Sequence, residues 1–90
     1  MRILVTAGGT EEPVDGVRRL ANTSTGTTGG VIARGFAEHG AEVLLLHAER
    51  APLDSIAVKR DTFVTFADLE NALRTHLGAS DWDAVIHLAA

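Results

Sequence analysis

A chain of 90 residues with 46% hydrophobic and 22% charged side chains has room for one globular domain and is too apolar for a disordered segment. Its net charge of −4, with acids and bases mixed along the sequence, excludes the basic stripe that nucleic-acid backbones require. The absence of cysteine excludes disulfides and thiol chemistry, and no apolar run approaches the length of a membrane span. Because Met1 leads directly into a short strand-like run rather than a signal peptide, we expect a cytoplasmic protein with no nucleic-acid or membrane partner.

The first half of the chain predicts a strand, a long loop, a helix and a second strand. Residues 3–7 (ILVTA) are apolar and rich in β-branched side chains, which is typical of a buried strand. Residues 8–27 contain Gly, Pro, Asp, Asn, Ser and Thr without periodicity, so we expect a loop. Apolar positions at helical spacing predict a helix over 28–39, which Gly40 would end, and the apolar run 41–48 predicts the second strand.

The second half predicts a strand over 61–66, a helix over 66–77 and a final apolar strand over 83–90. Thr65 is a suitable N-cap for this helix, and Asp68 lies three residues further on, which is the spacing of a capping box.

This order of elements predicts an α/β fold, a Rossmann-like three-layer α/β/α arrangement around a parallel sheet. Right-handed crossovers would place the strand 3–7 between 41–46 and 83–89. Ligands of such sheets bind beyond the carboxyl ends of the strands. Because the sequence stops on an apolar strand at one of these ends, we interpret the chain as a truncated half of the fold.

Two glycine-bearing segments are the candidates for binding a phosphate group. The glycines after the first strand allow a sharp turn and close approach of a ligand, although a plain turn remains an alternative. The segment before the first helix offers hydroxyls, free N–H groups and a positive dipole end, although simple helix capping remains open. The candidate residues are Gly8, Gly9, Thr10, Ser24, Thr25, Gly26 and Gly29.

The two segments form longer patterns: VTAGGT-x-EP-x-D-x-VR begins at Val5, and N-x-STG-x-x-G begins at Asn22 and leads into the predicted helix. Taken together, these patterns resemble the start of the phosphopantothenoylcysteine synthetase family, which acts in coenzyme A biosynthesis. The closing DAVIHLAA is similar to the family's strand before a VSDY-like segment. The resemblance spans residues 1–90, which would be the N-terminal part of a Rossmann-like nucleotide-binding synthetase domain.

The resemblance implies a phosphopantothenate–cysteine ligase that uses CTP in most bacteria and ATP in eukaryotes, with Mg²⁺. The carboxylate of 4′-phosphopantothenate would attack the α-phosphate, and the amine of cysteine would then displace the nucleoside monophosphate. Asn22 matches the family asparagine that handles the acyl-nucleotide, and the segment from Ser24 to Gly29 would lie near the phosphates. Three further positions match the strand end that lines the nucleotide site: His87, Leu88 and Ala89.

The resemblance also sets limits on what this chain does alone. The family's catalytic lysine and aspartate would lie past Ala90, so we expect the 90 residues by themselves to be inactive. Thr27 stands where the family often has lysine or histidine, which removes one possible phosphate partner. The family further implies a homodimer of the full-length form and a phosphopantothenoylcysteine decarboxylase partner, fused or separate.

Two other functions remain open. An NAD(P)-dependent short-chain reductase or epimerase would share ILVTAGGT and DAVIHLAA, but the third glycine at dinucleotide spacing is missing, and Glu49 is the one candidate acid after the second strand. A non-catalytic nucleotide-binding module is the other alternative.

Several remaining polar and aromatic residues predict no chemistry. The four histidines are not at metal-site spacing, so we expect no metal site in the protein. We interpret Glu11 and Glu12 as a solvated pair and Trp82 as a packing residue.

Overall fold

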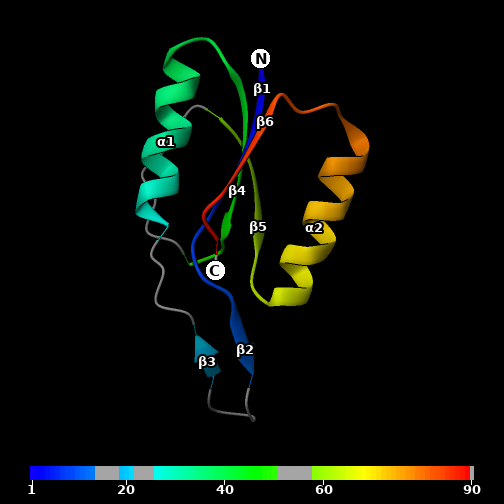
Figure 1. Cartoon of the computed structure of the whole chain (residues 1–90). Coiled ribbons are helices and arrows are strands. Elements are labelled where there is room, and N and C mark those ends of the chain that lie inside the picture. The colour runs from blue at the N-terminus through cyan, green and yellow to red at the C-terminus, as the bar shows by residue number, and fades with distance from the viewer. Residues whose placement is uncertain (14–18, 22–25, 51–57, 90) are drawn as a thin grey trace.

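The computed structural model describes residues 1–13, 19–21, 26–50 and 58–89. Along the chain the elements are β1 (Arg2–Ala7), β2 (Glu11–Pro13), β3 (Arg19–Ala21), α1 (Thr27–Glu38), β4 (Glu42–Ala48), β5 (Lys59–Phe63), α2 (Phe66–Ala79) and β6 (Ala84–His87) (Figure 1). In the ranges described, neither helix has the length and apolar character needed to cross a membrane.

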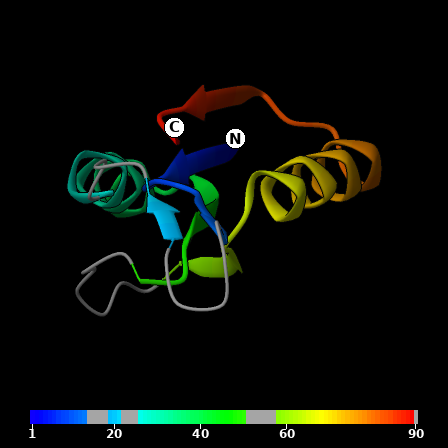
Figure 2. The ribbon, with the colours of Figure 1, turned by 90° about the horizontal axis from the view of Figure 1, so that it is seen from below.

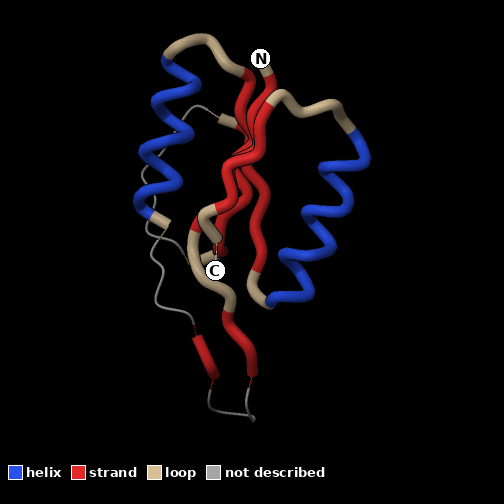
Figure 3. Tube along the Cα trace, in the orientation of Figure 1, coloured by secondary structure: helices blue, strands red, loops and turns tan. Residues whose placement is uncertain are grey.

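The main sheet has four parallel strands in the order β5-β4-β1-β6, which confirms the predicted topology. Figure 3 shows the strands of this sheet in red between the two blue helices. β1 lies at the centre because the chain first crosses through α1 to β4 on one side. It then returns through α2 to β6 on the other side. All carboxyl ends of the four strands therefore meet at one edge of the sheet, which we call the carboxyl edge.

The two helices cover opposite faces of this sheet, which confirms the three-layer arrangement (Figure 2). Successive side chains of a strand point to opposite faces, so a continuous apolar run supplies two cores. The α1 face buries Ile3, Val5, Ala7, Ala33, Val43 and Leu45. The α2 face buries Leu4, Leu44, Leu46, Ala48, Phe63 and Leu69.

A small antiparallel hairpin made of β2 and β3 corrects the expectation of a plain loop over residues 8–27. Glu11 pairs with Ala21 and Pro13 with Arg19, and the hairpin projects beyond the carboxyl edge (Figure 1). Strands of three residues without apolar alternation carry no periodic signal, so the sequence did not reveal them.

The boundaries of three other elements also differ from the prediction. β5 covers Lys59–Phe63 rather than 61–66, because the capping box at Thr65 starts α2 at Phe66. α2 continues to Ala79 rather than ending at residue 77. β6 ends at His87 rather than continuing to the end of the chain.

Candidate functional site

The carboxyl edge brings together three of the segments that the sequence singled out. Gly8 follows β1, His87 ends β6 beside Thr6 of β1, and Gly26 begins α1. Because β1 and β6 are neighbours in the sheet and α1 packs on β1, residues up to about 80 positions apart in the sequence reach one edge. The predicted site residues Asn22, Ser24 and Thr25 lie outside the described residues.

Gly8 allows the chain to leave β1 in a conformation that other residues resist. Its φ angle is 92°, in the region that L side chains rarely adopt. A Cβ atom at this position would lie 2.7 Å from the Cβ of Ala48, at the end of β4. The turn after β1 therefore requires glycine for its own geometry, and the contact of Gly8, Gly9 and Thr10 with a nucleotide stays a prediction.

The first turn of α1 contains no acidic residue to compensate the positive end of the helix dipole. The N-cap is Gly26, with φ 83° and no capping side chain. The backbone N–H groups at such a helix start favour an anion. This geometry is compatible with the expected phosphate site at Gly26.

The start of α2 lies at the same edge but is already occupied by two carboxylates. Asp68 Oδ2 accepts hydrogen bonds from the backbone N–H of Thr65 (3.0 Å) and of Val64 (3.2 Å), while Thr65 Oγ1 accepts one from Asp68 N (3.1 Å). Glu12 Oε1 accepts a further bond of 2.7 Å from Phe66 N. These backbone donors hold the pKa of Asp68 below its ordinary value. A second anion is therefore disfavoured here.

The contacts of Glu12 also correct our interpretation of Glu11 and Glu12 as a solvated pair. Glu12 binds the N-terminus of α2, and Glu11 Oε1 lies 3.4 Å from Arg50 Nη1. The backbone N–H of Glu11 donates to Val64 O at 2.7 Å. The segment that leaves β1 is thus attached to the β5–α2 junction, which brings the start of the hairpin across the carboxyl edge.

Gly29 has a packing role that the sequence reading did not anticipate. It is buried in the first turn of α1, and a Cβ atom on it would lie 2.4 Å from the Cβ of Ala7. The glycine lets the helix approach β1 closely, which fixes where the N-terminus of α1 points. The predicted contact of Gly29 with phosphate stays a prediction beside this structural role.

The end of β6 is held by a side chain that sequence reasoning missed. Thr6 is fully buried, and its Oγ1 lies 2.7 Å from His87 Nδ1. The same oxygen accepts hydrogen bonds from Leu88 N (3.0 Å) and Ala89 N (3.2 Å). The available signal was a hydroxyl inside an apolar strand, because a buried hydroxyl requires partners.

The buried histidine His47 is satisfied internally. His47 is 7% exposed, and its Nδ1 donates to the carbonyl oxygen of Ala48 at 2.8 Å. Over the part of the chain that is described, no group of three His, Asp or Glu side chains is arranged to hold a metal ion.

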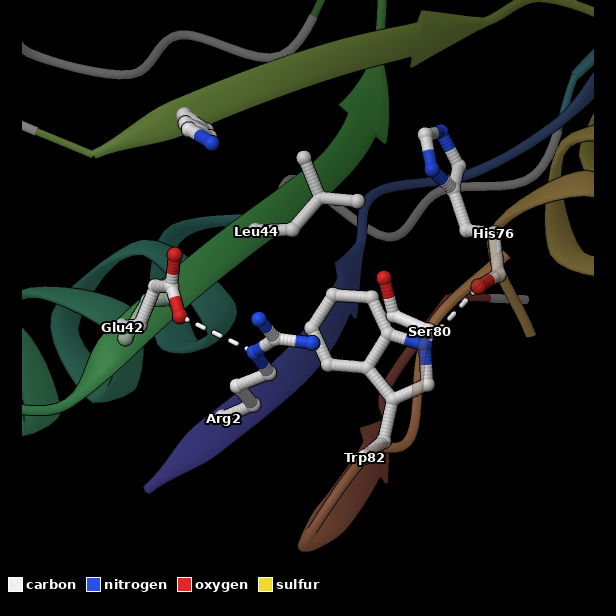
Figure 4. Close-up of a pocket in the computed structure, with 8 residues that line it drawn as sticks. Arg2, Glu42, Leu44, His76, Ser80 and Trp82 are labelled. Carbon is white, nitrogen blue, oxygen red and sulfur yellow. Dashed lines mark hydrogen bonds and ion pairs between the residues drawn. The ribbon is translucent and has the colours of Figure 1, made fainter. Parts of the chain in front are cut away.

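A pocket of about 280 Å³ lies at the opposite, amino edge of the sheet, between α2 and the strands (Figure 4). Arg2 Nε pairs with Glu42 Oε2 at 3.1 Å, and the Trp82 indole donates to His76 O at 2.9 Å. The hydrogen bond from His76 also lowers the pKa of Asp61. Because these groups bind one another, we interpret the pocket as part of the packing of α2, and the interpretation of Trp82 as a packing residue is confirmed.

Comparison with known proteins places this architecture in one family. The profile of the DNA/pantothenate metabolism flavoprotein C-terminal domain (DFP) matches residues 1–90. The coenzyme A biosynthesis bifunctional protein CoaBC of Mycolicibacterium smegmatis is 37% identical over 91 residues. That alignment covers 100% of this chain, and the chain spans 22% of the length of that relative.

Solved structures agree with this assignment. The DNA/pantothenate metabolism flavoprotein from Streptococcus pneumoniae superposes with a TM-score of 0.90 at 33% identity, over 100% of this chain and 39% of that one. The C-terminal domain of a CoaBC protein gives 0.88 at 36% identity, over 99% of this chain and 44% of that one. A mutant of Cab2 in complex with phosphopantothenate-cysteine gives 0.86 at 20% identity, over 99% and 44%, which shows the shared fold. The chain therefore belongs to the DNA/pantothenate metabolism flavoprotein C-terminal domain family, and its predicted resemblance to the phosphopantothenoylcysteine synthetase domain is confirmed.

Proposed function

We propose that the protein carrying this chain is a phosphopantothenate–cysteine ligase of coenzyme A biosynthesis. The observation that carries the proposal is the start of α1, which lies at the carboxyl edge without an acidic residue, whereas the start of α2 is occupied by Asp68 and Glu12. The relatives and neighbours named as coenzyme A biosynthesis proteins support this choice of reaction. Membership of this family favours the ligase over the reductase alternative.

In the proposed reaction, a carboxylate oxygen of 4′-phosphopantothenate attacks the α-phosphorus of CTP or ATP. The bond to the β-phosphate oxygen breaks, and pyrophosphate leaves. The amine of cysteine then attacks the acyl carbon, and the nucleoside monophosphate leaves as the amine loses a proton. The backbone N–H groups at Gly26 and the turn at Gly8 would bind phosphate oxygens, and the amide of Asn22 would donate to the developing oxyanion.

Mg²⁺ would enter this site with the nucleotide. The described residues contain no group of three side chains able to hold the ion, and Mg²⁺ commonly binds through substrate phosphates and water. When bound, it would neutralise charge on the phosphates. The strand-end residues His87, Leu88 and Ala89 would line the nucleotide beside the phosphate site.

The remaining features of the proposal concern the whole protein. We expect the 90-residue chain on its own to lack turnover, because it spans only 44% of the related CoaBC C-terminal domain structure. We also propose a cytoplasmic homodimer that works with a phosphopantothenoylcysteine decarboxylase, either fused or separate.

Calorimetry on the intact protein tests the choice of nucleotide. CTP or ATP should bind in the presence of Mg²⁺, and NADH should not bind at comparable concentration. Release of pyrophosphate should require 4′-phosphopantothenate, and the cysteine adduct should form after it. Micromolar binding of NADH with no binding of either triphosphate would contradict the proposal.

A further inference from the structure

Packing of the core does not explain why residue 6 has a hydroxyl group, which is fully buried in Thr6. The residues around it on β1 are Leu4, Val5 and Ala7, all buried, and Thr6 itself has no exposed surface. Valine would fill the same space without a polar atom to satisfy. Thr6 lies on β1 opposite His87 in the register of β6, at the carboxyl edge.

The hydrogen bonds around Thr6 Oγ1 determine where its proton points. A hydroxyl has two lone pairs and one proton. The backbone N–H of Ala89 donates to the oxygen at 3.2 Å, and that of Leu88 is shared between this oxygen (3.0 Å) and the Thr6 carbonyl oxygen (3.1 Å), so donors face both lone pairs. The proton is therefore donated to the remaining neighbour, His87 Nδ1, at 2.7 Å.

This arrangement selects one tautomer of His87. A ring nitrogen that accepts a hydrogen bond cannot carry a hydrogen itself. Because Nδ1 is the acceptor here, the neutral His87 ring carries its hydrogen on Nε2. The residue as a whole is exposed, and no described residue forms a hydrogen bond with Nε2. The ring thus has a neutral donor at the edge where parallel sheets bind ligands.

We propose that Thr6 is a positioning residue of the ligand site. Its hydroxyl binds the backbone N–H groups of Leu88 and Ala89 and so fixes the two residues after β6. It also holds His87 as the Nε2–H tautomer, which can donate to an oxygen acceptor of the bound nucleotide. The identity of the ligand rests on the proposed function, whereas the tautomer does not.

The tautomer is tested first, on the ligand-free intact protein. Long-range ¹H–¹⁵N correlation spectra of the imidazole distinguish a protonated Nε2 from a protonated Nδ1. The wild type and Thr6→Ser, which keeps the hydroxyl, should show Nε2–H alone at pH 8. Thr6→Val, which keeps the shape, should show a mixture. Nδ1–H as the main form in the wild type would overturn the proposal without the need for any variant.

Nucleotide affinity tests the second step. Loss of one oriented hydrogen bond should weaken binding of Mg²⁺-CTP or Mg²⁺-ATP by roughly tenfold in Thr6→Val, and Thr6→Ser should restore it to within about threefold. His87→Ala should match Thr6→Val. When Thr6→Val is combined with His87→Ala, it should weaken nucleotide binding by less than about a further threefold, because Thr6 acts through His87. Full additivity would overturn the proposal, since Thr6 would then act through the fold alone.

The two arms separate this inference from the proposed function. If the wild type binds neither triphosphate, the proposed function fails, and the donor role toward a nucleotide fails with it. The tautomer spectra still decide whether Thr6 positions His87. If Thr6→Val does not fold, the wild-type spectra still test the tautomer of His87. The donor role is then tested by comparing His87→Ala with His87→Gln, which retains a side-chain N–H donor. Recovery in His87→Gln of most of the affinity lost in His87→Ala supports donation from this position, and equal loss or unchanged affinity in both variants overturns it.

Discussion

At the level of single residues, the geometry of the carboxyl edge depends on glycines whose neighbours leave no space for a Cβ atom. Gly29 lies against Ala7 with space for no Cβ, whereas Gly35, on the same helix, has no atom within 4 Å of such a Cβ. Both glycines lie within α1, but a side chain at Gly29 would overlap Ala7, whereas a side chain at Gly35 would meet no neighbouring atom. Only the position of α1 on β1 makes them different.

Gly29→Ala should therefore destabilise the protein by about 1–3 kcal/mol, because α1 must shift to relieve the overlap with Ala7. Gly35→Ala should be neutral or stabilising by up to about 1 kcal/mol, since alanine favours the helix. Urea unfolding of both variants gives the comparison. Equal effects of the two substitutions would contradict the close packing of α1 on β1.

Asn22 is the residue that the family resemblance singles out for chemistry. Asn22→Asp would place a negative charge beside an anionic acyl-nucleotide, at a cost of about a few kcal/mol in a partly buried site. In the intact protein, formation of the cysteine adduct should fall by roughly two orders of magnitude, as for the loss of one oriented donor. Pyrophosphate release and adduct formation are measured together, with thermal unfolding as the folding check.

Asn71→Asp is the matched control for this substitution. Asn71 is exposed on α2, so the same chemical change there should leave both half-reactions unaffected. Unchanged adduct formation in a folded Asn22→Asp protein would remove Asn22 from the mechanism.

At the level of elements, the two helices start at the same edge but differ in capping and in the charge of their first turns. α2 begins with a capping box of Thr65 and Asp68, and Glu12 from the hairpin binds its first N–H group. α1 begins at Gly26 without an acidic residue in its first turn. The charged and hydroxyl side chains at α2 stabilise the fold, and the start of α1 is the one compatible with an anionic ligand.

Thr65→Ala should lower stability by about 1 kcal/mol, as is typical for loss of an N-cap. Asp68→Asn should also destabilise the protein at neutral pH, because the charged acceptor of Thr65 N and Val64 N is lost. Because the folded-state pKa of Asp68 is lowered, its contribution is complete above the ordinary value of 3.8 and is lost as the pH falls through the folded-state value.

Denaturant unfolding between pH 2 and pH 7 tests this dependence. The wild type should lose stability as the pH falls below about 4, and Asp68→Asn should lose less over the same interval. Asp81→Asn is the matched control with the wild-type dependence, because Asp81 is exposed and its carboxylate has no hydrogen bond or ion pair with the described residues. An identical acid dependence in Asp68→Asn and wild type would show that the capping carboxylate does not contribute.

At the level of the whole molecule, the order β5-β4-β1-β6 gives the strands unequal protection. β1 and β4 each have a parallel neighbour on both sides, whereas β5 and β6 form the two edges of the described sheet. β1 is buried from Ile3 to Ala7, while Val85 in β6 is 46% exposed. The carboxyl edge is thus built around a rigid central strand.

Hydrogen exchange on the 90-residue chain should reflect this order. Amides of β1 and β4 should exchange most slowly, at the rate set by global unfolding, because both ladders must break together. Amides of β6 that point away from β1 should exchange faster by at least an order of magnitude. If all amides of β6 exchanged slowly, the outer edge of this strand could not be unpaired. Such a result would indicate that two chains associate through β6.

The sequence by itself determined the four main strands, both helices and their order, because continuous apolar runs and helical spacing are local signals. It also determined the capping box at Thr65 and the family, since both depend on residue identity at fixed spacing. It did not predict the hairpin, whose short strands have no periodic pattern, or the end of β6.

Only the tertiary structure decided which polar groups hold the fold together. Glu12 binds the start of α2 across 54 residues of sequence, and Thr6 binds His87 across 81. Gly29 lies against Ala7 because α1 crosses β1 there. Such contacts depend on strand order and register, which bring distant residues together, and a linear pattern of residue types does not contain those distances.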